Sequence, residues 1–190
     1  MATDIDICNV ALQKLGAGRI TSLSDNTAAA RACAVSYPHC VEAELRANPW
    51  RFAIKRASLA EDAVAPDWGK ASSYTLPSDF LKILRPYPED NSLEIDYEIE
   101  GKKIYSDLSS PLNIRYVAFI TDTSLMDALF RDAVACRMAL QMCEALTQSN
   151  TKKAAISAEY KDSISVAKKS NAFDSIPQQP PEDSWLSVRR

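Results

Sequence analysis

The hydrophobic pattern of this chain changes period twice, and this change limits its fold more than any other feature. Up to residue 50, and again after residue 120, apolar residues recur every three or four positions, as in amphipathic helices. Between these two parts, prolines separate short runs rich in Ile, Leu, Val and Tyr, which is typical of strands and turns. We therefore predict a mainly α fold with an inserted β region, of the α+β class.

Three parts follow from these changes of pattern. We predict that residues 1–50 and 121–170 form a helical bundle of about four helices, and residues 51–120 a small antiparallel β insertion. Residues 171–190 are rich in proline and polar residues, which favours an extended carboxyl-terminal tail. A chain of this length can bury about 70% of its unfolded surface, so a sizeable core is expected.

The first two helices carry start and stop signals. Thr3 can cap the first helix, and Gly16 closes it. We expect the second helix to begin at Ser24 and to end at Asn48. Pro38 lies inside this second segment and should kink or split it, because proline removes a helical hydrogen bond.

The two later helices differ in polarity. Ser124 and Asp127 resemble a capping box, and two apolar stripes start at Leu125 and Met126. Burial on two sides predicts a central position for this third helix. The fourth helix, predicted over residues 151–170, is more polar and should lie at the surface.

The clearest strand signal alternates apolar residues with four acids, before a turn at Gly101 that predicts a hairpin. The acids are Glu94, Asp96, Glu98 and Glu100. Three interpretations stay open: a solvated strand face, a carboxylate pair for glycoside hydrolysis, or a face that repels DNA phosphates. Alternation of this kind is expected of any half-exposed strand, which favours the first.

Charge and cysteine content exclude several classes of protein. Lys and Arg total 22 against 25 Asp and Glu, without a long basic block, which argues against a dedicated DNA-binding protein. The five cysteines form no C-x-x-C pair, and two pairs recur at seven-residue spacing on helical faces. We interpret them as reduced core residues, which fits a reducing cytoplasm, and not as zinc ligands, since zinc sites need more closely spaced ligands.

Motifs for catalysis are scarce. His39 is the only histidine, and Cys40 beside it should point elsewhere, since adjacent helical residues diverge. Four glycines supply neither a dinucleotide fingerprint nor a phosphate loop. The first six residues lack a signal-peptide pattern, and no apolar run approaches the ~20 residues of a membrane span. We predict a protein that is not an enzyme, needs no cofactor or metal, and does not enter a membrane.

An ordered set of short matches, spread over nearly the whole chain, carries a resemblance to a known family. The matching residues are 15–16, 20, 22–23, 30, 33, 37–38, 45, 49–53, 56–57, 59–60, 74, 76–77, 79–81, 116–118, 127–130, 184–186 and 189–190. On this set the chain resembles the tail tubular protein A family of short-tailed phages and their prophages, the head-to-tail adaptors. His39–Cys40 and Leu125–Met126 depart from the family's usual pattern.

The resemblance implies a virion protein that forms a closed ring, typically of twelve copies, at the neck of the phage. The ring would be assembled in the host cytoplasm, bind the portal after DNA packaging, and receive the tail tube or nozzle, with DNA only passing through its channel. The acids named above would then face that channel. A cell-wall hydrolase that acts during genome delivery, and a DNA-packaging or capsid-stabilising factor, remain the alternatives.

The resemblance also assigns roles to residues at the carboxyl terminus. The portal-docking residues would be Trp185, Leu186, Val188, Arg189 and Arg190. In this interpretation Trp185 fills an apolar pocket of the portal and the arginines pair with carboxylates. The alternative is that Trp185 folds back on its own subunit. Trp50 is interpreted as a packing residue that covers the end of the bundle.

Overall fold

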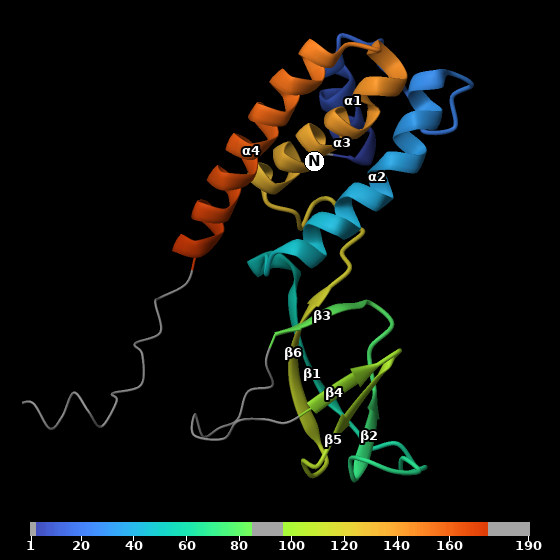
Figure 1. The fold of residues 1–190 in the computed structure, drawn as a ribbon, viewed down its shortest axis with the longest axis vertical. Helices are drawn as coiled ribbons and strands as arrows, with labels where there is room; N and C mark the ends of the chain where they lie inside the picture. Colours follow the sequence, from blue (N-terminus) through green and yellow to red (C-terminus); the bar gives the residue numbers. More distant parts are fainter. Residues whose placement is uncertain (1–2, 85–96, 175–190) are drawn as a thin grey trace, which may run out of the picture.

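The fold combines a helical bundle with two small antiparallel sheets, as the change of pattern predicts (Figure 1). This computed structural model describes residues 3–84 and 97–174. The helices are α1 (Asp4–Leu15), α2 (Ala28–Ala47), α3 (Ala128–Thr147) and α4 (Asn150–Phe173), with a short 3-10 turn at Arg51–Ala53. The strands are β1 (Ile54–Leu59), β2 (Ser72–Thr75), β3 (Phe80–Leu84), β4 (Tyr97–Glu100), β5 (Lys103–Ser106) and β6 (Leu112–Ala118).

The caps of α1 are those expected. The Thr3 hydroxyl accepts the N–H of Asp6, and the Asp6 carboxylate accepts the N–H of Thr3 at 2.8 Å, which makes a reciprocal capping box. Gly16 closes the helix with φ at 70°, a left-handed conformation that glycine adopts without a Cβ penalty.

Helix α2 corrects two expectations. It begins at Ala28 under a Thr27 cap, and not at Ser24, because the nearby Asp25 carboxylate is used to bind the N–H groups of Thr21 and Ser22. The helix is also not split, since it runs continuously through Pro38. It does end at Asn48, as expected.

Helix α3 lies at the centre of the bundle and packs against each of the other three helices, which confirms its predicted position (Figure 1). The stripe that starts at Met126 is buried, and Phe130 within it is fully enclosed. The stripe that starts at Leu125 is not buried at its beginning, because α3 starts only at Ala128, after its Asp127 cap. Leu125 is 56% exposed and Leu129 37% exposed.

Helix α4 is the polar surface helix expected, although it extends to Phe173. Its buried residues are Ile156 and Ala167. All five cysteines are buried and unpaired, which confirms their interpretation as core residues.

Two three-stranded sheets form between α2 and α3 in the sequence, in the orders β1-β6-β3 and β2-β5-β4. Strand β1 follows α2 and β6 leads toward α3, and the two pair antiparallel from Ile54–Val117 to Leu59–Leu112. The chain enters the sheets at β1 and leaves them at β6, and this pairing holds those two strands together. The predicted hairpin is β4–β5, turning at Gly101 with φ at 58°.

Trp50 packs where the helices meet the sheets. Its side chain is 2% exposed, and its indole N–H donates to the Glu44 carbonyl oxygen at 2.8 Å. The ring meets Phe130 edge-on at 5.0 Å between centroids. The predicted packing role of Trp50 is therefore confirmed.

Candidate docking surfaces

The five residues assigned to portal docking, Trp185, Leu186, Val188, Arg189 and Arg190, lie outside the described residues. The point from which this segment leaves the body is well defined. Near the end of α4, the Asn171 side chain donates to the Pro49 carbonyl oxygen at 3.1 Å and accepts the Arg51 N–H at 2.8 Å. These bonds fix the end of α4 beside the end of α2.

Half of the acidic ladder lies within the described residues. Glu98 and Glu100 are exposed on the edge strand β4, while Glu94 and Asp96 lie outside the described part of the chain. The two carboxylates share one face and are about 7 Å apart along the strand, from the rise per residue. Across the strand, Glu98 faces Tyr105, and Glu100 faces Lys103. Within the described ranges no hydrogen bond or ion pair orients either carboxylate.

The histidine and cysteine considered for nucleophilic catalysis point apart. His39 is exposed, whereas Cys40 is buried and its thiol donates to the Gln141 amide oxygen at 2.9 Å. Burial raises the pKa of the Cys40 thiol to about 11, so the thiol stays protonated near neutral pH. This pair therefore does not form a nucleophile and base.

A buried polar cluster ties three helices together. Glu44 of α2 is 1% exposed, and its carboxylate accepts a hydrogen bond from Arg137 of α3 at 2.7 Å and another from the Tyr160 hydroxyl of α4. Burial, followed by the bond to Glu44, raises the pKa of Tyr160 to about 12. Both donors serve a carboxylate that would be costly to bury alone, so the cluster fixes how the helices meet.

This cluster is not among the features predicted from the sequence. Glu44 lies among apolar neighbours on the inward face of α2, and an acid at such a position signals a buried partner. Which partner it binds is decided by residues far along the chain.

A loop between β1 and β2, residues 60–71, is held by polar contacts at its first end. The Asp62 carboxylate accepts hydrogen bonds from Ser73 at 3.0 Å and Thr75 at 2.8 Å, and pairs with Lys103 at 2.9 Å. The bond from Lys103, followed by that from Thr75, lowers the pKa of the Asp62 carboxyl. This end of the loop is therefore fixed to β2 and β5.

The second end of this loop is held by Asp107, whose carboxylate accepts the Ala71 N–H at 2.9 Å and pairs with Lys70 at 3.1 Å. Between the two anchored ends, Trp68 is 89% exposed and Val64 is 77% exposed. The loop lies at the end of the sheets far from the helices (Figure 1). We call it the Trp68 loop. Tryptophan is enriched among the residues that dominate binding at protein interfaces, so an exposed tryptophan on a loop fixed at both ends is a candidate docking contact.

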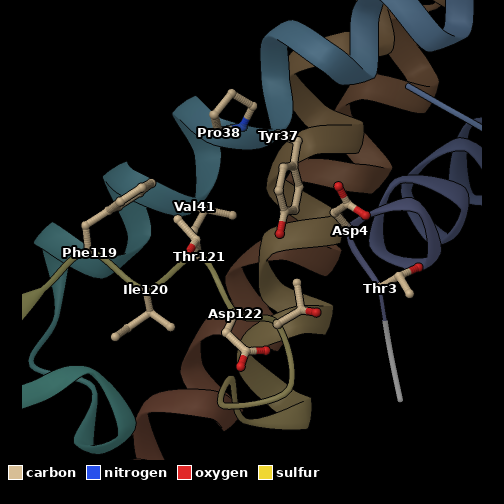
Figure 2. Close-up of a pocket in the computed structure, with 10 residues that line it drawn as sticks. Thr3, Asp4, Tyr37, Pro38, Val41, Phe119, Ile120, Thr121 and Asp122 are labelled. Carbon is tan, nitrogen blue, oxygen red and sulfur yellow. The ribbon is translucent and has the colours of Figure 1, made fainter. Parts of the chain in front are cut away.

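A hollow opens where the helices meet the segment that follows β6 (Figure 2). Its volume is about 580 Å³, within the usual range of ligand pockets. Half of its ten lining residues are apolar or aromatic: Tyr37, Pro38 and Val41 of α2, and Phe119 and Ile120 of the segment after β6. We call it the α2 hollow.

Two carboxylates stand at the rim of the α2 hollow. Asp4, at the start of α1, accepts the N–H of Ile5 at 2.9 Å, and Asp122 accepts that of Ser124 at 2.9 Å. A carboxylate has about four acceptor positions, so both acids can bind further donors. Burial, followed by the charge of Asp4, raises the pKa of Tyr37 to about 12.

The described residues contain no cluster of three or more His, Cys, Asp or Glu side chains arranged to bind a metal ion. Over the same ranges, no helix is both long enough and apolar enough to cross a membrane. In the comparisons with known proteins, no family model matches the chain, and no curated protein matches it.

Proposed function

We propose that the chain is a subunit of a head-to-tail adaptor ring in a short-tailed phage. The ring binds the portal protein after DNA packaging and connects it to the tail tube or nozzle, so that DNA passes through its channel. In this role the protein is a structural component of the virion neck, acts without catalysis or a cofactor, and assembles with copies of itself, in a ring of about twelve as the family resemblance implies.

The observation that carries the proposal is the presentation of Trp68. The Trp68 loop is fastened at both ends by carboxylate contacts, yet its tryptophan stays 89% exposed. Tryptophan is enriched among the residues that dominate binding energy at protein interfaces. A protein that joins two partners needs such a contact at a fixed position. The resemblance to the head-to-tail adaptors indicates which partners these are.

Two further features support an adaptor. The polar cluster around Glu44 fixes the helices to one another, and the β1–β6 pairing fixes the two strands that connect to them. Such a body can hold two partners in a fixed relative position. The chain continues beyond α4 from a fixed point, which leaves residues 175–190 for the portal. Glu98 and Glu100 are exposed, and acids that line a channel would repel DNA phosphates and keep the duplex from sticking.

The proposal is tested by mixing the purified chain with its portal protein and imaging the complexes by electron microscopy. We expect rings on the portal with the wild-type chain and none after deletion of residues 177–190. The triple variant Trp185→Ala, Arg189→Ala, Arg190→Ala should also lose attachment. Normal docking of the deleted chain would contradict the assignment of the tail.

Trp68→Ala is the matched control, since it removes the same side chain from a different surface. This variant should still form rings on the portal but should fail to recruit the tube or nozzle protein. If Trp68→Ala recruits that protein normally, the Trp68 loop is not the surface that binds the tube or nozzle protein.

A further inference from the structure

The α2 hollow has a chemistry that selects its occupant. Half of its lining side chains are apolar or aromatic, among them Val41 and Ile120, while Asp4 and Asp122 give its rim a negative charge. An occupant therefore needs a large apolar group close to one or two cations. Arginine suits the rim, because it forms strong charge-assisted hydrogen bonds with carboxylates.

The chain itself carries a segment with this composition. Trp185 and Leu186 are followed closely by Arg189 and Arg190. We propose that this segment, residues 185–190, binds in the α2 hollow of its own subunit when no partner is present. The indole fills the apolar part of the hollow, and the two arginines pair with Asp4 and Asp122.

The length of the chain permits this contact. Asn171 holds the end of α4 beside Arg51, close to the end of α2. The hollow lies about ten residues back along α2, at Tyr37 and Val41, which is about 15 Å at the rise of an α-helix. Residues 175–190 can extend over about 50 Å, so the segment can pass round the body and enter the hollow.

Attachment to the same chain favours this occupant over a second copy. A tethered segment has an effective concentration on the order of millimolar when its length matches the span. The same segment of another molecule is present only at the concentration of free protein, which is much lower than this effective concentration. The two arginines also balance the two rim acids in charge, without a third component.

This inference does not rest on the proposed function, although it adds to it. The residues that would occupy the hollow are those assigned to the portal, so the two bound states exclude each other. A portal must then displace the segment from the hollow, and the free subunit keeps its docking residues covered until that moment.

The experiment uses the full chain labelled with fluorotryptophan and observed by fluorine NMR. Two tryptophans act as internal standards: Trp68, 89% exposed, should show the full solvent isotope shift between H2O and D2O, and Trp50, 2% exposed, almost none. Single Trp→Phe variants assign the three signals. We expect the isotope shift of Trp185 to be less than half that of Trp68.

The pair Asp4→Asn with Asp122→Asn tests the hollow, because asparagine keeps the local hydrogen bonds and removes the charge. In this variant the Trp185 isotope shift should rise to that of Trp68, while the Trp50 signal shows that the fold persists. The matched control neutralises two exposed acids elsewhere, Asp67→Asn with Asp162→Asn, and should leave Trp185 unchanged.

Three outcomes would overturn the inference. Trp185 could match Trp68 in the wild-type chain, which would mean that the segment is not bound. The Trp185 isotope shift could be small but unchanged in the Asp4→Asn, Asp122→Asn variant, which would mean that the segment binds elsewhere. Protection that disappears on dilution would assign the hollow to a second copy. None of these outcomes depends on a portal protein, so failure here is separate from failure of the adaptor proposal.

Discussion

Replacing Trp50 by alanine should destabilise the protein far more than the same replacement at Trp68. A buried tryptophan removes roughly 200 Å² from water, which corresponds to about 5 kcal/mol at about 25 cal/mol per Å². This figure is an upper bound, because the unfolded chain already buries part of that surface. The lost hydrogen bond to the Glu44 carbonyl oxygen adds about 1 kcal/mol.

We therefore expect Trp50→Ala to lower the free energy of unfolding by about 4 kcal/mol, in line with other Trp→Ala changes in cores. Trp68→Ala should change the free energy of unfolding by less than about 0.5 kcal/mol, since its side chain is 89% exposed. Trp50→Phe keeps an aromatic ring but loses the N–H donor, so its cost should be intermediate, about 2 kcal/mol.

The measurement is equilibrium unfolding in urea, followed by far-ultraviolet circular dichroism and extrapolated linearly to water. Trp50→Phe provides the comparison if the alanine variant does not fold. Equal stability of the Trp50 and Trp68 variants would refute the reasoning, because it would mean that Trp50 does not hold the helices against the sheets.

Three other predictions concern the polar cluster and the buried thiols. Arg137→Met should lower the free energy of unfolding by about 2 to 3 kcal/mol, because Glu44 would stay buried with Tyr160 as its remaining partner. Urea unfolding measures this, with Arg56→Met at an exposed position as the control. Equal losses of stability in the two variants would contradict the prediction. Because folding raises the pKa of Tyr160 from 10.0 to about 12, its stabilising contribution is complete below pH 10 and is lost toward pH 12. The stability of Tyr160→Phe should therefore fall less steeply than wild type over that interval, and parallel curves would argue against the shift. All five cysteines should react slowly with a thiol reagent in the native protein and rapidly in denaturant, and one fast native thiol would contradict their burial.

Local signals predicted the helices well where the deciding contacts lie within a few residues. The Thr3 cap and the Gly16 stop of α1 are such cases, and both appear as expected. The capping box predicted at Ser124 and Asp127 is wrong, because Asp127 itself caps α3. The packing of Trp50 was also predictable, because a proline before an indole stops the helix and leaves the ring at its end.

Pro38 shows where local reasoning fails. A proline costs a helix one hydrogen bond, but its ring and the side chain of Ala34, one turn earlier, both lie on the exposed face of α2. Water can reach that side, while Cys33, Cys40 and Leu45 pack into the core on the other side. Core packing of the residues before and after the proline therefore keeps one continuous helix.

By itself the sequence determined the class of fold, the cap and end of α1, the buried Met126 stripe of α3 and the β4–β5 hairpin, because periodicity and capping depend on a few neighbouring residues. The starts of α2 and α3 were predicted at Ser24 and Ser124, whereas the observed caps are Thr27 and Asp127. Only the tertiary structure decided the rest. Glu44 meets Arg137 and Tyr160 across 93 and 116 positions, and the α2 hollow joins the start of α1, the middle of α2 and the segment after β6. A pattern shows that a face is buried but not which distant face covers it, because that choice depends on how all the elements pack together at once.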